Sequence, residues 1–208
     1  MAGTSSLDIR GWSPIGDPDF VYHGLLGQVL ALLIIELSDR PIIPLDLSNY
    51  AVILRRCVGS LYEWANEKGI SGDGGKNQKI NLAPIKHALR KTEAAIFRFE
   101  KWEPYWEQNV LAANGWEPAG LGVRRLDVNN RMSAFETNLL DLEPGGGIPN
   151  RTQFKHVVFG PQLWNEYEEA YFPAIMDVVE TEDWPLAQKA IDRVARIIDQ
   201  AASALVKM

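Results

Sequence analysis

The chain has 208 residues, 46% of them hydrophobic, which is enough for one sizeable domain. Its formal net charge of −6, with no basic stripe, argues against a nucleic-acid-binding protein. The single cysteine, Cys57, excludes an internal disulfide. Residues Met1–Asp17 lack the basic start and the apolar core of a signal peptide, so no targeting segment is expected there.

The first expected helix, Phe20–Asp39, is apolar on nearly every side, a pattern typical of a helix at the centre of a domain. Its apolar run, Leu25–Leu37, falls short of the roughly 20 residues that a membrane span needs, so we expect a buried core helix. The second helix, Leu47–Glu67, has its apolar residues at helical spacing. Either Asp46 or Ser48 can cap it, because both side chains accept a hydrogen bond from backbone N–H groups.

Two more helices are expected in the middle of the chain. The third covers roughly Leu82–Trp102 and should kink or end at Pro104, because proline cannot donate the hydrogen bond that continues a helix. Tyr105–Ala113 can continue the helix beyond that kink. The fourth covers Asp127–Leu142 and carries Val128, Met132, Phe135, Leu139 and Leu142 on one side.

A stretch of small, basic, aromatic and proline residues precedes the last helices. The glycines and proline of Gly145–Pro149 stop the preceding helix. The apolar residues Phe154, Val157, Val158 and Phe159 are suited to an extended conformation, and Gly160-Pro161 is expected to turn the chain. Together with two glycine-rich stretches, this segment gives three expected flexible loops, at about 69–81, 114–122 and 143–171.

The last two helices are marked by proline and aspartate. Pro173 suits the first turn of a short helix ending near Val179, and Asp183 is expected to cap the final helix. Apolar residues of that helix recur at spacings of three and four for almost three heptads, the pattern of a bundle helix. Without βαβ alternation, the fold class is all-α: a helical bundle of four to five long helices with a long irregular loop inserted before the last helices.

The expected domain organisation is simple: residues 1–15 form a disordered or expression-derived leader, and residues 16–208 form a single helical domain. Catalytic patterns are missing from the sequence. The three histidines, His23, His87 and His156, are far apart and belong to no metal-binding motif, and structural roles are expected for His23 and His87. Cys57 lies among apolar helix positions, which favours a buried small hydrophobe over a nucleophile. No catalytic residue, metal ligand or cofactor is therefore expected in this chain.

Short motifs follow one another along the chain, among them Gly16–His23, Asn130–Glu136 and Lys155–Pro161. In this order they resemble the C-terminal part of the glutamate carboxypeptidase II and transferrin receptor family. The resemblance covers roughly residues 16–64 and 126–205 and is weaker between them. The chain looks like the helical dimerisation domain of that family without its peptidase domain. The matching segments are Gly16–His23, Glu36–Ser38, Pro44–Asp46, Asn130–Glu136, Ile148–Arg151, Lys155–Pro161, Asn165–Tyr167 and Phe172–Pro173.

The resemblance implies a homodimer, a parent anchored in a membrane, and a lumenal, vacuolar or extracellular location for this soluble fragment, which itself makes no membrane contact. Enzymatic members bind two zinc ions in an upstream peptidase domain, which is the other implied partner. Their last zinc ligand is a histidine that would fall near Thr4, where this sequence has none. Zinc is therefore expected only in the missing peptidase domain of the parent.

One site residue carries over from the resemblance. In glutamate-cleaving members a Lys-Tyr pair of this domain holds the terminal carboxylate of the substrate, and here the pair is Glu166-Tyr167. Tyr167 keeps the phenolic donor and is the candidate substrate-binding residue of the parent. Glu166 would repel a carboxylate or, in the alternative interpretation, simply faces solvent. The triplet Asn150-Arg151-Thr152 is a glycosylation sequon that matters only in the secretory pathway.

Two functions stay open at this point. The first is a non-catalytic homodimerisation domain of a glutamate carboxypeptidase-like zinc peptidase homologue, which also completes the parent's substrate pocket. The second is a receptor-type or sorting adaptor domain that binds a protein partner through its helices. Intact zinc ligands in the upstream part of the parent would favour the first.

Overall fold

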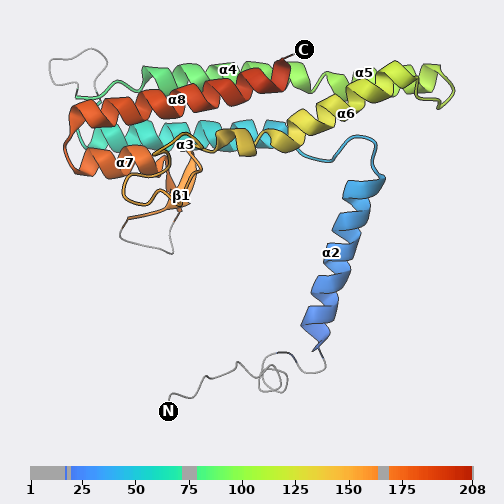
Figure 1. Ribbon diagram of the computed structural model, residues 1–208, viewed down its shortest axis with the longest axis horizontal. Helices are drawn as coiled ribbons and strands as arrows, with labels where there is room; N and C mark the ends of the chain where they lie inside the picture. The colour runs from blue at the N-terminus through green and yellow to red at the C-terminus, as the bar shows by residue number, and fades with distance from the viewer. Residues whose placement is uncertain (1–16, 18–19, 72–78, 164–168, 208) are drawn as a thin grey trace. The chain divides into compact units, whose positions relative to one another are not determined.

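The computed structural model describes residues 17, 20–71, 79–163 and 169–207. These residues belong to two compact units, Met1–Pro44 and Leu45–Met208, and each unit is described by itself. The first unit contains helix α2 (Val21–Asp39) (Figure 1). The carboxylate of Asp17 accepts hydrogen bonds from the backbone N–H groups of Tyr22 (2.8 Å) and His23 (2.9 Å), which stabilises the N-terminal end of α2.

Helix α2 begins and ends close to the predicted positions, but the prediction that it is a buried core helix is wrong. None of its residues is buried, although most of them are large and apolar. Leucine, isoleucine and valine on every face favour burial, but the described residues of the first unit, taken by itself, do not cover them. By its length of 19 residues and its composition, α2 also meets the requirement for a membrane span.

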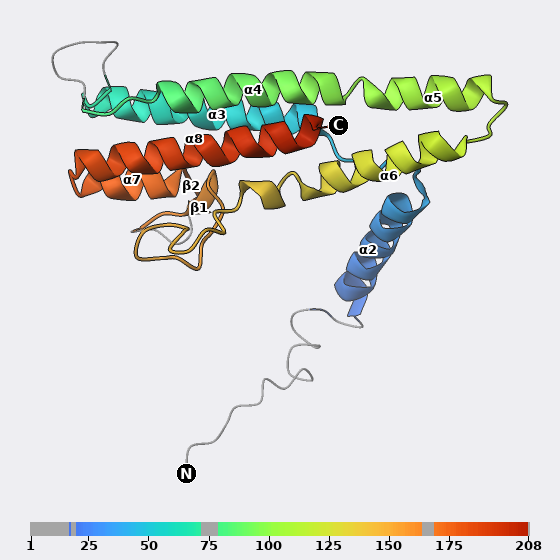
Figure 2. The ribbon, with the colours of Figure 1, turned by 45° about the horizontal axis from the view of Figure 1, so that its top comes forward.

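The second unit is a bundle built around three long helices that lie side by side: α3 (Leu47–Glu67), α4 (Ala83–Phe99) and α8 (Trp184–Val206) (Figures 1 and 2). Helix α4 runs antiparallel to α3 and in the same direction as α8. The most extensive contact joins α4 to α8, and α7 (Pro173–Glu180) packs against α8. The all-α helical fold expected from the sequence is confirmed.

The apolar spacing of α8 explains its central place. Nine of its residues are buried, and the fully covered Ile191 and Ile198 lie seven positions apart, on the same face. Asp183 caps this helix as predicted, accepting a hydrogen bond from the N–H of Leu186 (3.0 Å). Of the two candidate caps for α3, Asp46 takes the role through the N–H of Asn49 (2.9 Å).

The middle of the chain differs from prediction in its boundaries. Helix α4 ends at Phe99, and α5 (Trp102–Ala112) follows with Pro104 in its first turn, where a missing N–H costs nothing. Helix α6 covers Ala119–Ala134, about eight residues before the predicted 127–142. Gly120 and Gly122 are helical here, because glycine weakens a helix without ending it.

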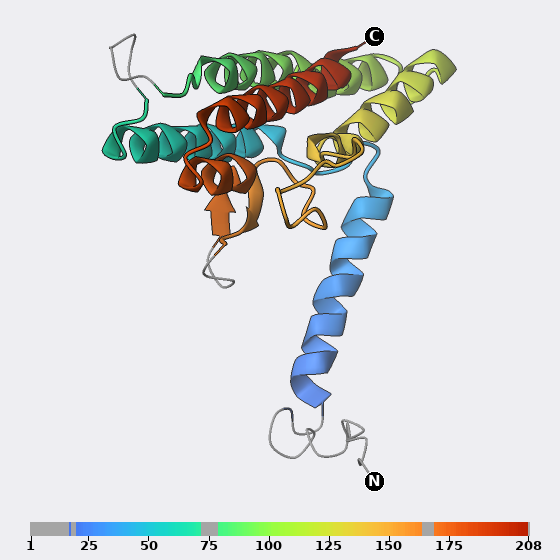
Figure 3. The ribbon, with the colours of Figure 1, turned by 60° about the vertical axis from the view of Figure 1, so that its left-hand side comes forward.

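The segment between α6 and α7 holds a 3-10 turn, η2 (Thr137–Leu139), and a small antiparallel ribbon. Strand β1 (Phe159–Pro161) pairs with β2 (Glu169–Tyr171), with Phe159 opposite Tyr171. The expected turn at Gly160-Pro161 is therefore wrong: these residues form part of a strand. Pro161 is tolerated because it ends a short strand of a two-stranded ribbon. The ribbon lies beside α7 (Figure 3).

A pair of isoleucine substitutions tests this distribution of the core. We expect Ile198→Ala, at 1% exposure in α8, to lower the free energy of unfolding by about 2–5 kcal/mol, because it leaves a cavity. The matched control Ile34→Ala, at 62% exposure in α2, should change it by less than about 0.5 kcal/mol. Urea unfolding followed by circular dichroism measures both. Equal losses would contradict the placement of the core in α8.

Candidate functional site

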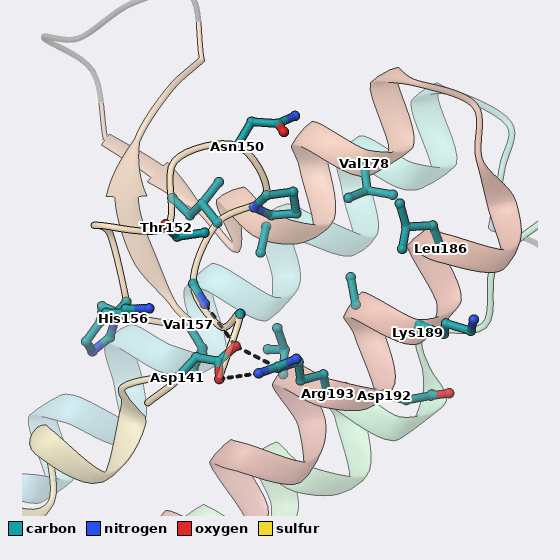
Figure 4. Close-up of a pocket in the computed structure, with 18 of the residues that line it drawn as sticks. Asp141, Asn150, Thr152, His156, Val157, Val178, Leu186, Lys189, Asp192 and Arg193 are labelled. Atoms are coloured by element: carbon teal, nitrogen blue, oxygen red, sulfur yellow. Dashed lines mark hydrogen bonds and ion pairs between the residues drawn. The ribbon is translucent and has the colours of Figure 1, made fainter. Parts of the chain in front are cut away.

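A cavity of about 720 Å³ lies where residues 141–157 face α7 and α8 (Figure 4). Apolar side chains line it from both sides, as in most ligand-sized cavities, with Val157 from the loop and Val178 and Leu186 from the helices. Its charged lining is more basic than acidic, with Lys155, Lys189, Arg193 and Arg196 against Asp141 and Asp192.

The buried carboxylate of Asp141, which lines this cavity, connects the loop to α8. The guanidinium of Arg193 donates from Nη2 to Oδ1 of Asp141 (2.7 Å), and its Nε lies 2.6 Å from Oδ2 (Figure 4). The N–H of Gly147 also donates to Oδ2 (3.1 Å). Burial alone would raise the pKa of Asp141, but the hydrogen bonds from Arg193 and Gly147 outweigh it and lower that pKa below its ordinary value of 3.8. Asp141 is therefore a charged anchor for the loop.

Two glycines let the loop close around this anchor. A Cβ atom at Gly146 would lie 2.8 Å from the carbonyl oxygen of Asp141, which is closer than side chains tolerate. Gly147 has φ of +97°, and a Cβ there would lie 2.7 Å from the carbonyl oxygen of Phe154. Lys155 secures the same turn by donating from Nζ to the carbonyl of Gly146 (2.7 Å). The glycine run thus fixes the course of the loop. The prediction that it stops the preceding helix is wrong, because α6 already ends at Ala134.

Arg151 holds the next turn of the loop against β1 and α7. Its Nη1 donates to the carbonyl oxygens of Pro161 (3.0 Å) and Gln162 (3.2 Å). Its Nη2 donates to Oδ2 of Asp177 on α7 (2.6 Å), and both side chains of this pair are largely buried. A single guanidinium, with donors in a fixed fork, therefore joins three separate segments.

His156 ties the end of the loop to Glu136, which directly precedes η2 and in turn lies near Tyr50 of α3. Its Nδ1 accepts hydrogen bonds from the N–H groups of Val158 (3.2 Å) and Phe159 (3.0 Å), so this nitrogen carries no proton. Its Nε2 lies 3.0 Å from Oε1 of Glu136, and this contact lowers the pKa of the Glu136 carboxyl. Burial, with the negative charge of Glu136 nearby, raises the pKa of Tyr50, which therefore stays protonated.

These interactions describe a positioned loop. Asp141, Arg151, Arg193 and His156 are each engaged in holding the chain, which leaves none of them poised as a nucleophile or a general base. Among the residues that the structure describes, no three His, Cys, Asp or Glu side chains group as a metal ion would require. The geometry suits the presentation of a surface.

The sequence-predicted site residues are scattered or lie outside the described residues. Tyr167 and Glu166 belong to the latter group. Cys57 is buried on α3, as predicted, and His87 lies on the exposed face of α4. Sequence reasoning missed the pairing of Asp141 with Arg193, since the partners are 52 residues apart and only the fold brings them together.

Comparison with a family model gives a match over most of the bundle. The model described as transferrin receptor-like dimerisation domain matches residues 80–206, which include α4 to α8 and the whole loop.

Comparison with curated proteins gives matches that also include the first unit. A probable glutamate carboxypeptidase of Arabidopsis thaliana is 30% identical over 196 residues, covering 91% of this chain and 24% of that protein. A putative zinc metalloprotease of Saccharomyces cerevisiae is 25% identical over 181 residues, covering 83% of this chain and 21% of that protein. A protein of Schizosaccharomyces pombe described as an inactive zinc metalloprotease is 27% identical over 177 residues, covering 85% and 20%. The chain thus spans between a fifth and a quarter of these relatives.

Removing the anchor charge should loosen the loop. We expect Asp141→Asn to lower the free energy of unfolding at pH 7 by about 2 kcal/mol, less than for a fully buried pair because Arg193 is one-third exposed. The control Glu143→Gln, which alters the half-exposed pair with Arg196, should cost less than about 1 kcal/mol. Urea unfolding measures both losses.

The effect of Asp141→Asn on the free energy of unfolding should depend on pH. Because the pKa of Asp141 is depressed in the folded state, its stabilising contribution is present above the unfolded value and is lost as pH falls through the folded value. The stability difference between wild type and Asp141→Asn should therefore shrink on acidification below roughly pH 4. A constant difference between pH 7 and pH 3 would contradict the role assigned to this carboxylate.

Proposed function

The chain belongs to the family of transferrin receptor-like dimerisation domains, and from this membership we propose that it is a non-catalytic domain joining two copies of a longer, peptidase-like parent. The observation that carries the proposal is the family match over residues 80–206, which covers most of the bundle and its positioned loop. A two-fold dimer uses the same surface on both copies, so one domain per chain suffices.

The peptidase-like nature of the parent is supported by the relatives. Two are described as a probable glutamate carboxypeptidase and a putative zinc metalloprotease, and a third as an inactive zinc metalloprotease. The parent's activity, and any zinc that it uses, would reside in chain outside these 208 residues. The non-catalytic part of the proposal is supported by the loop, whose described ionisable groups are occupied in holding the fold.

Helix α2 supports a second part of the proposal, a contact with the peptidase-like portion of the parent. Its apolar residues occupy every face, and none is buried. An isolated helix of this composition is stable only when its surface is covered. We propose that the peptidase-like portion supplies the cover.

The loop that carries Tyr167 is proposed to complete the parent's substrate pocket. The anchors at Asp141, Arg151 and His156 hold the described part of the loop that precedes Tyr167 in the sequence. An acidic Glu166 beside Tyr167 disfavours a substrate with a terminal glutamate. Cleavage assays on the full-length parent, comparing peptides that end in glutamate or alanine, should show no glutamate preference.

The dimerisation role has a direct test in solution. We expect light scattering of this chain, across a concentration series, to approach a mass of twice 23.3 kDa. The same sample in concentrated urea should give the single-chain mass, which calibrates the measurement. A mass of 23.3 kDa at every concentration would contradict self-association through this domain.

A further inference from the structure

Helices α5 and α6 form an arm, residues 102–126, that extends past the C-terminal end of α8 (Figures 1 and 2). No residue of α5 is buried, although the bundle helices beside it bury a full face. Large apolar side chains are exposed along the arm: Tyr105 (46%), Leu111 (76%), Trp116 (75%), Val123 (68%) and Leu126 (57%). An apolar surface of this kind on a soluble domain marks an interaction site.

The arm is held in one conformation despite its lack of a core. Glu117, between the two helices, accepts hydrogen bonds from Nε1 of Trp106 (2.6 Å) and from Nε and Nη2 of Arg125 (2.8 and 2.9 Å). These hydrogen bonds lower the pKa of Glu117, which keeps it charged. At its base, Arg131 donates to the carbonyl of Leu205 on α8 (3.2 Å). A surface ordered in advance loses less entropy when it binds.

The charges of the two helices are opposite in sign. Exposed Glu103 and Glu107 make α5 acidic, and within the described part of the chain neither forms an ion pair. Arg124 on α6 is exposed and likewise unpaired there, whereas Arg125 is paired with Glu117. An acidic helix and a basic helix on one chain are complementary to the same two helices on a second copy.

Several exposed charges elsewhere in the described part of the chain are neutralised by ion pairs. On the outside of the bundle, Arg55 pairs with Glu93 and Lys91 pairs with Asp199. On α2, Glu36 pairs with Arg40 four residues later. On the arm, exposed apolar side chains occur together with exposed charges of both signs that form no ion pair among the described residues.

We propose that the arm is the surface on which a second copy of this chain docks, with α5 of each copy against α6 of the other around a two-fold axis. The inference rests on the proposed dimerisation function and gives it a location. A specific interface removes roughly 800 Å² from each partner. One aromatic side chain buries about 150–250 Å², so several of the arm's exposed residues must be covered together. Trp116 and Tyr105 are of the types that dominate binding energy.

Charge reversal on the two helices tests the pairing. In the variant Glu103→Arg/Glu107→Arg both α5 and α6 are basic, so two copies of it repel each other. In the variant Arg124→Glu the acidic α5 of one copy faces an acidic α6 of the other, which is also repulsive. We expect each variant alone to dimerise at least about tenfold more weakly than wild type. A 1:1 mixture should recover dimer close to wild type, because each basic α5 then meets an acidic α6. Sedimentation velocity measures all three samples, and recovery in the mixture shows that both variants are folded.

Two controls complete the experiment. Arg90→Glu reverses an exposed arginine on α4 and should leave the dimer unchanged. Trp116→Ala removes the most exposed aromatic side chain and should weaken the dimer by about 30-fold. A wild-type dimer that neither reversal weakens would overturn the arm as the interface and leave dimerisation standing. A wild-type monomer throughout would instead contradict the proposed function itself.

Discussion

The buried face of α8 is the interaction on which the rest of the domain depends. It packs along α4, receives α7 and η2, and contacts the end of α6 near the base of the arm. Its fully covered residues, among them Ile191 and Ile198, supply much of the apolar burial of the second unit. The polar edge of the same helix carries Arg193, which holds Asp141. One helix therefore sets both the core and the position of the loop.

The loop keeps its course with little regular secondary structure because its buried side chains are hydrogen-bonded at most of their polar atoms. Asp141, Arg151 and His156 each accept or donate several hydrogen bonds, and Gly146 and Gly147 let the backbone pass where a side chain would collide. The result is a rigid surface beside a cavity, in a domain whose described residues group no metal ligands.

The sequence predicts those features of the fold that depend on neighbouring residues, such as helix caps and apolar spacing. Helices α3 and α8 were placed to the residue at their starts because Asp46 and Asp183 cap them and the apolar spacing is regular. The sequence does not predict the start of α6, because Gly120 and Gly122 in its first turn favour a loop. The exposure of α2 and the pairing of Asp141 with Arg193 could not be predicted, since both depend on which distant segments meet.

The central claim is that α8 organises a self-contained bundle and that a second copy covers the arm. Amide hydrogen exchange, measured at low and at high protein concentration, tests this claim most directly. The account predicts strong protection of α3, α4 and α8 at both concentrations, and protection of α5 and the first turns of α6 only at the higher one. Contradiction would come from α8 amides that exchange as fast as those of α5, or from an arm whose exchange does not respond to concentration.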